Sequence, residues 1–180
     1  MPAKGDSFCT NTKLTEMKQS LVHCSALFLL MLITGVFWGT WFTLTRSIEG
    51  FSAEEFIHIG KVIIANVAVP MSIIMPAGIV LMLLSLWFYG DKKSAGFYTG
   101  LLSLVLIIIV LLVTLLVMVP IDNIIKQWTT ATIPQNWNET RHTWNTFHAV
   151  RTFASLASFA LFSWSVLTNN YKRQDKVQYK

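Results

Sequence analysis

FYTGLLSLVLIIIVLLVTLLVMV, residues Phe97–Val119, is a continuous apolar run without any Asp, Glu, Lys or Arg. An α-helix of about 20 residues crosses the hydrocarbon core of a bilayer, so this run is long enough to span a membrane. Leu21–Thr45 and Val62–Tyr89 are equally free of those charges, and Ala149–Thr168 is a fourth, less apolar run. Four such runs in 180 residues leave no polar shell for a soluble domain. The sequence therefore predicts an all-α, four-transmembrane-helix bundle.

The chain divides into a membrane domain and two polar ends. We expect residues 21–170 to form the four-helix membrane domain, residues 1–20 a polar cytoplasmic tail and residues 171–180 a basic cytoplasmic tail. The first span is longer than the apolar core of a usual signal peptide and follows a long polar lead. We therefore expect it to remain uncleaved, which makes the protein a multi-pass integral membrane protein.

The distribution of positive charge predicts the orientation. Nine of the 14 lysines and arginines fall at the two termini and in the second loop, and five fall on the opposite side. Because cytoplasmic loops carry the excess of Lys and Arg, both termini are expected in the cytoplasm and the first and third loops outside. The net charge of +5 suits anionic membrane lipids as partners, and nothing in the sequence indicates nucleic acid. Cys9 and Cys24 lie on the predicted cytoplasmic side, where we expect no structural disulfide.

A long polar and aromatic segment, Pro120–Thr152, connects the third and fourth spans. Five of its residues recur at intervals of four, three, four and three, which places them on one face of a helix over roughly 20 Å. They are Trp137, Arg141, Trp144, His148 and Arg151. Aromatic rings alternating with cations and an imidazole indicate a binding or catalytic site. The alternative is that Arg and Trp anchor the helix at the interface while a carbonyl satisfies the imidazole.

Other polar residues are candidates for the same site. Asp122, Asn123 and Trp128 precede the stripe, and Asp122 is expected to pair with Lys126 one helical turn later. On the other side of the bundle, Ser52 and Glu55 form a capping-box pattern that predicts a helix start. His58 and Asn66 on that helix are candidates for the opposite wall of the site.

Metal and acid–base chemistry are the two readings of these residue types. A metal site would combine Glu54 or Glu55 with His58, Asp122 and His148, but no local pair of ligands has the usual spacing. Acid–base chemistry fits better, because an imidazole changes charge near neutral pH and neighbouring arginines would hold it neutral, as a base requires. We therefore expect no bound metal and a flat aromatic ligand that stacks on the tryptophans.

The residues Pro120-Ile-Asp-Asn123, Trp128 and Pro134-x-x-Trp137-x-x-x-Arg141-x-x-Trp144-x-x-x-His148-x-x-Arg151 together resemble the closing motif of anthrone oxygenase-like membrane proteins. The resemblance implies a small four-helix protein that oxidises anthrones or hydroquinone-like aromatics with molecular oxygen and without a bound cofactor. It implies His148 as the base, with Arg141 and Arg151 stabilising the oxyanion. The family commonly has Asn where this chain offers Asp122-Asn123, so the register of that pair stays open.

Two other functions compete with an oxygenase. A non-catalytic membrane subunit, or a lipid- or quinone-binding protein, would use the same stripe as a docking surface, and would associate with itself or with a membrane-complex partner. A transporter is disfavoured, because the three cleanest spans carry no carboxylate that could couple ions. Asn138-Glu139-Thr140 is an N-glycosylation sequon on the predicted outer face.

Overall fold

The computed structural model describes residues 4–178, and it describes their side chains from Met17 to Asn169. The described residues form helices without any strand, and four of the helices are long and apolar enough to cross a membrane. The prediction of an all-α, four-helix membrane protein is therefore confirmed. In chain order the elements are α1 (Lys4–Thr40), the π-helical turn η1 (Trp41–Thr45), the 3₁₀ turn η2 (Ile48–Gly50), α2 (Ala53–Trp87), α3 (Ala95–Val113), the π-helical turn η3 (Thr114–Met118), α4 (Val119–Gln127) and α5 (Trp137–Gln178).

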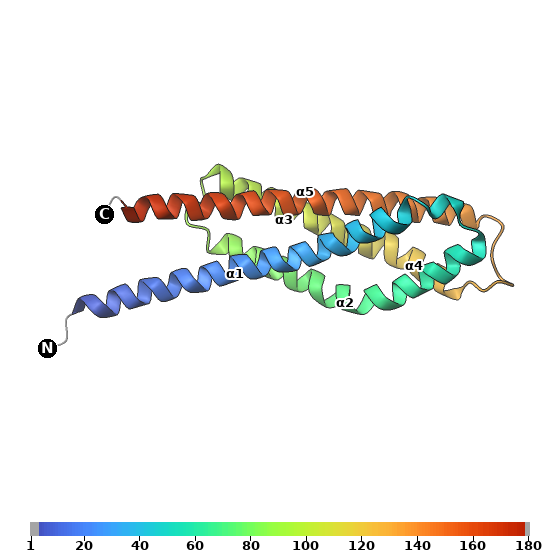
Figure 1. Cartoon of the computed structure of the whole chain (residues 1–180), viewed down its shortest axis with the longest axis horizontal. Coiled ribbons are helices and arrows are strands. Elements are labelled where there is room, and N and C mark those ends of the chain that lie inside the picture. Colours follow the sequence, from blue (N-terminus) through green and yellow to red (C-terminus); the bar gives the residue numbers. More distant parts are fainter. Residues whose placement is uncertain (1–3, 179–180) are drawn as a thin grey trace.

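The helices form an elongated bundle (Figure 1). Helix α1 begins and α5 ends at the same end of the bundle, and the α1–α2 and α4–α5 connections lie at the opposite end. Helix α5 packs mainly against α3 and α1, while α1 also packs against α2. The expected 1–20 tail is largely helical, because α1 already begins at Lys4. The side chains of residues 1–16, with Cys9, and of the 171–180 tail lie outside the described residues.

The third helix continues past the point where we expected it to end. The expected end was Val119, before Pro120, but the helix runs on through α4 to Gln127. A proline inside a helix lacks a donor and clashes with the preceding turn. Here the wider π-helical turn η3 comes immediately before Pro120, which stands in the first turn of α4. The backbone irregularity is absorbed there, so the polar residues from Asp122 onward stand on a helix.

The stripe and the fourth apolar run belong to one helix. Helix α5 starts at Trp137, after Ile133-Pro134, so the stripe is helical as expected and continues without interruption into the run that begins at Ala149. The Pro120–Thr152 segment therefore consists of two helix ends and a short non-helical connection. The carboxyl end of α4 and the amino end of α5 lie together at the end of the bundle remote from the start of α1 (Figure 1).

Helix α2 starts as predicted and bends in its middle. The Ser52 backbone N–H donates to Glu55 Oε2 at 2.8 Å and the Glu55 N–H donates to Ser52 Oγ at 3.3 Å, so the capping box is confirmed. Pro70 and Pro76 stand inside the helix, and the ribbon changes direction in this part of α2 (Figure 1). Proline explains the bend, because its ring displaces the preceding turn.

Glycine permits a close helix contact at Gly96 but is not needed for one at Gly35 or Gly39. Gly35 and Gly39 have the small-xxx-small spacing that lets another helix approach, yet a Cβ atom at either position would meet no atom within 4 Å. The close approach occurs instead at Gly96, where α3 meets α5. A Cβ atom there would overlap the hydroxyls of Tyr89 and Thr168.

Gly96→Ala is expected to destabilise the bundle by about 1–3 kcal/mol, because the added methyl group must displace a packed side chain. The hydroxyl of Tyr89 cannot move freely, since it donates to the Ser165 carbonyl oxygen at 3.0 Å. Thermal unfolding of the purified protein in detergent measures the effect. Gly39→Ala is the control, and equal unfolding temperatures for the two variants would contradict the packing at Gly96.

Candidate functional site

The residues of the stripe form two groups of contacts along α5. In the first group, Arg141 lies 4.8 Å above the Trp137 ring. In the second, the Trp144 and His148 rings are stacked with centroids 5.0 Å apart and an interplanar angle of 6°. Arg151 donates to His148 Nδ1 from Nε at 3.1 Å and its Nη2 lies 2.8 Å from the same atom.

Trp137 and Arg141, which we call the outer part of the stripe, hold the α1–α2 connection against α5. Arg141 is buried and donates from Nη1 to three backbone carbonyl oxygens, those of Ile48, Glu49 and Phe51, at 3.0–3.3 Å. Its Nη2 forms an ion pair with Glu49 Oε2 at 3.0 Å. Trp137 packs against Phe56 with ring centroids 6.0 Å apart. These contacts make the outer part of the stripe an attachment between elements.

Arg141→Met is expected to lower the free energy of unfolding by about 3 kcal/mol, because it leaves buried carbonyl oxygens without a donor. Glu49→Gln is expected to cost about 0.5 kcal/mol or less, since the Glu49 side chain is 58% exposed and the ion pair is screened. Thermal unfolding in detergent separates the two variants. A larger loss for Glu49→Gln than for Arg141→Met would show that the ion pair, and not the carbonyl contacts, carries the attachment.

The inner part of the face borders a cavity of about 340 Å³ inside the bundle. The cavity lies between the two apolar core clusters, since Phe37 and Met75 of its wall belong to one and Ile64 and Trp144 to the other. Most of its walls are apolar side chains of α2 and of the α3–η3–α4 helix. A volume of this size, with few polar groups, is typical of a site for a small organic molecule.

Three polar side chains meet at one end of this cavity. Asp122 of α4 and both Trp144 and Arg151 of α5 line it, and we call these three residues the polar end. Trp144 Nε1 donates to Asp122 Oδ1 at 3.2 Å, and Arg151 interacts electrostatically with Asp122. The Arg151 guanidinium also lies 4.7 Å from the centre of the Phe37 ring. A carboxylate and a cation therefore both border the same apolar cavity.

His148 stands behind the polar end and does not line the cavity. It is almost fully buried, and its Nδ1 accepts from Arg151. Its Nε2 has no hydrogen-bond partner of normal geometry, and the edge of Phe37 faces the ring with centroids 6.4 Å apart. Since a guanidinium only donates, the imidazole nitrogen that faces Arg151 must be the acceptor, which corresponds to a neutral ring with its proton on Nε2.

The other candidates lie away from the cavity. Asn123 is exposed and accepts from Lys126 at 3.4 Å, while Lys126 also interacts electrostatically with Asp122, the partner expected for it. Trp128 is buried in the apolar cluster that also contains Ile64 and Trp144. His58 and Asn66, the expected opposite wall, are exposed and do not line the cavity. Asn138 of the sequon is exposed.

Apolar residues of α2 and α1 occupy the wall that we had expected His58 and Asn66 to form. Ile64, Met71 and Met75 of α2 and Phe37 of α1 line the cavity there. Their identity carried no sequence signal, because an Ile or Met that faces a cavity in a membrane helix looks the same as one that faces lipid. The only readable hint was the pair of prolines that bends α2 beside the cavity.

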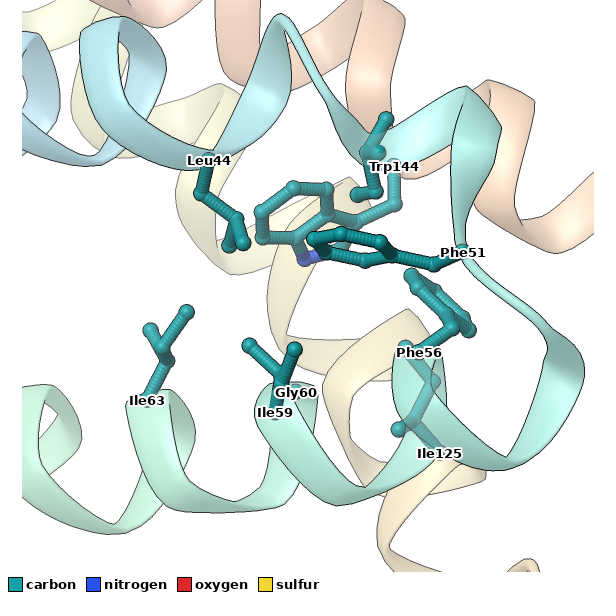
Figure 2. A pocket seen from close by; sticks show the side chains of 9 residues that line it. Leu44, Phe51, Phe56, Ile59, Gly60, Ile63, Ile125 and Trp144 are labelled. Atoms are coloured by element: carbon teal, nitrogen blue, oxygen red, sulfur yellow. The ribbon is translucent and has the colours of Figure 1, made fainter.

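Trp144 separates the cavity from a second, much smaller hollow of about 10 Å³. Figure 2 shows its indole ring between Leu44 and Phe51, above Ile59 and Ile63 of α2. Trp144 lines both spaces, so its ring is held by apolar contacts on the outer side while its N–H reaches Asp122 on the inner side. A ring fixed in this way gives a flat surface of constant orientation.

Among the described residues, no three His, Cys, Asp or Glu side chains are grouped as metal ligands would be. The residues named in the metal alternative are also spread apart, since His58 is exposed on α2 and His148 is buried on α5.

One known protein family matches the chain. The sequence model of the anthrone oxygenase family matches residues 62–161, which is more than half of the 180 residues. The matched region runs from α2 into α5 and contains the polar end, His148 and every cavity-lining residue named above except Phe37, whereas His58 lies before it. No curated protein and no solved structure matches the chain.

Proposed function

Because the chain belongs to the anthrone oxygenase family, we propose that it is a membrane-embedded oxygenase that oxidises an anthrone- or hydroquinone-like aromatic with molecular oxygen and without a bound cofactor. The observation that carries the proposal is the cavity of about 340 Å³, whose apolar walls end at Asp122, Trp144 and Arg151. The charge distribution adds that the site faces the outer side of the membrane, with both termini in the cytoplasm.

The proposed reaction needs a base and a group that stabilises an oxyanion. An anthrone carries a CH₂ group opposite its ring carbonyl, and loss of one proton from that carbon gives a delocalised oxyanion. The carbon then adds O₂ and takes up a proton to form a hydroperoxide, which loses water and leaves a second carbonyl. Each turnover thus converts one anthrone and one O₂ into one anthraquinone and one water, with O₂ as the oxidant.

The residues that border the cavity fit these two roles. Arg151 faces the cavity with its positive charge and would stabilise the oxyanion, an interaction that is strong where water is scarce. Asp122 is the only carboxylate or imidazole among the described residues that line the cavity, so we assign proton removal to it. The Trp144 ring would orient the flat substrate.

His148 takes a different role from the one expected of it. As a base it would have to use Nδ1, which accepts from Arg151, or Nε2, which is buried. We therefore assign it to positioning: His148 holds the guanidinium of Arg151 toward the cavity. We assign Arg141 to the fold and not to the oxyanion, because both Nη groups of its guanidinium contact the α1–α2 connection and it does not line the cavity.

Oxygen uptake by the purified protein with anthrone tests the proposed function. Anthrone also oxidises without protein, so the rate is measured against a buffer blank and against Glu139→Gln, which changes an exposed carboxylate on α5. We expect one O₂ consumed for each anthraquinone formed. Stoichiometric binding of anthraquinone without any protein-dependent oxygen uptake would contradict an oxygenase and favour a quinone-binding protein.

Variants of His148 test its positioning role. His148→Leu removes the acceptor of Arg151 and is expected to lower kcat by about a hundredfold, because a misplaced charged group loses most of its effect. His148→Gln offers an amide oxygen to the same donor and is expected to recover a large part of that loss. If His148→Gln is as inactive as His148→Leu while both unfold at the same temperature, the imidazole itself takes part in proton transfer.

A further inference from the structure

The cavity reaches the outside of the bundle on the side of α2 and α3, at a slot between two pairs of residues. Ala68 and Ser72 are one helical turn apart on α2, and Leu115 and Val119 are one turn apart on the facing helix. All four line the cavity and are also exposed at the outer surface, with Leu115 53% and Val119 40% exposed. We call these four residues the slot.

The slot lies within the stretches long and apolar enough to span the membrane. Ala68 and Ser72 stand near the middle of the span Ala53–Trp87, and Leu115 and Val119 stand inside the span Ala95–Gln127. The surface beside them is apolar, since Val69 is 67% and Leu116 is 72% exposed. A surface of this composition in a multi-pass protein is in contact with lipid chains. The slot therefore faces the interior of the bilayer and not water.

The backbone of both helices is irregular beside the slot. Pro70 lies between Ala68 and Ser72 on α2, and the π-helical turn η3 includes Leu115 on the opposite rim. Proline bends and π-helical turns shift helices away from regular packing, and π-helical turns are frequent at functional sites. Helices α2 and α3 also contact each other much less than α3 contacts α5. We infer that the bend at Pro70 in α2 and the π-helical turn η3 keep the two helices apart at the slot.

From these observations we propose that the cavity takes its substrate sideways from the bilayer, and that the substrate is an anthrone- or hydroquinone-like aromatic dissolved in the membrane. Its apolar ring system enters between Ala68 and Leu115, and its oxygen reaches the Asp122–Arg151 polar end. This inference rests on the proposed function for the chemistry of the substrate, but the entry route stands on the slot alone. A compound confined to water has no path to the polar end through this opening.

The size of the opening provides the test. Ala68→Trp and Leu115→Trp each place a large ring at the slot, and both positions tolerate an aromatic side chain because they face lipid. Val69→Trp and Leu116→Trp are the matched controls, since each is the sequence neighbour of a slot residue, is more exposed or equally lipid-facing, and does not line the cavity. Size-exclusion profiles and unfolding temperatures are measured for all four variants to check that they fold.

The measurement is the rate at which anthraquinone, dissolved in the lipid of nanodiscs, binds to the reconstituted protein. We expect the association rate to fall by about tenfold or more in Ala68→Trp and Leu115→Trp and to stay at the wild-type value in both controls. We also expect the rate to follow the mole fraction of anthraquinone in the lipid and not its concentration in water. Wild-type rates in both slot variants, or a tightly held phospholipid that anthraquinone does not displace, would overturn the proposal.

Binding and turnover separate the two proposals. If the slot variants slow binding but no variant consumes oxygen, the entry route holds and the oxygenase fails. If the wild-type protein oxidises anthrone and the slot variants do so at the same rate with the same KM, the oxygenase holds and the entry route fails.

Discussion

Asp122→Asn is expected to reduce protein-dependent oxidation of anthrone by about 10²–10⁴-fold, the range that loss of a positioned base produces. The amide keeps an oxygen that can accept from Trp144 Nε1, so the packing of the polar end should persist. It has no lone pair basic enough to take a proton from carbon. The expected result is therefore a variant that binds anthraquinone with nearly the wild-type affinity and turns over very slowly.

The measurement for Asp122→Asn is oxygen uptake together with anthraquinone binding. Asn123→Asp is an informative companion, because it places a carboxylate on the exposed neighbour and leaves Asp122 in place. It also settles which residue of the Asp122-Asn123 pair does the chemistry. Wild-type turnover by Asp122→Asn would remove Asp122 as the base and return that role to His148. Loss of both binding and turnover would mark Asp122 as a substrate-binding group.

The membrane architecture was predictable because it depends on the length and composition of continuous sequence runs. Three runs of more than 20 residues without a charged side chain are typical of a bilayer interior, and each lies almost entirely in a helix long and apolar enough to cross a membrane. The shared face of Trp144, His148 and Arg151 was predictable for a similar reason, since neighbours three and four residues apart on a helix must meet. Local rules therefore describe both features.

The residues that line the cavity could not be predicted, because they depend on how each helix is rotated toward its neighbours. Arg141 and Arg151 both belong to the stripe, yet only Arg151 lines the cavity, because the two Nη groups of Arg141 contact the α1–α2 connection. His58 and Asn66 were expected to face the stripe, but the rotation of α2 turns both outward and brings Ile64 and Met75 inward. An amphipathic pattern would reveal such a rotation, and a helix that is apolar on all sides has none.

The end of the third helix shows a different limit. Pro120 usually signals the end of a helix, but here a π-helical turn precedes it and the helix continues as α4. No residue pattern announces a π-helical turn in a run of Leu, Val and Thr. The consequence for function is large, because a helix that ended at Val119 would leave Asp122 in a loop. As part of α4, the Asp122 carboxylate is held against Trp144.

Arg151→Met is expected to lower kcat for anthrone oxidation by about 10²–10³-fold, because it removes the charge that would stabilise the oxyanion. It also removes the partner of a partly buried carboxylate, so the single variant should unfold at a lower temperature. Arg151→Lys keeps the charge but cannot donate to His148 Nδ1 from two nitrogens, and should fall between wild type and Arg151→Met. Oxygen uptake and thermal unfolding are measured on all three proteins.

The double variant Asp122→Asn/Arg151→Met separates stability from catalysis. Removing both charges eliminates the unpaired carboxylate, so the unfolding temperature should recover toward the wild-type value and the two stability effects should not be additive. Activity should not recover, because the base and the oxyanion partner are both gone. If activity recovers together with the unfolding temperature, Asp122 and Arg151 only neutralise each other's charge and neither is needed for the reaction. If the unfolding temperature recovers and activity does not, the fold does not need the two charges. The charges then serve the reaction.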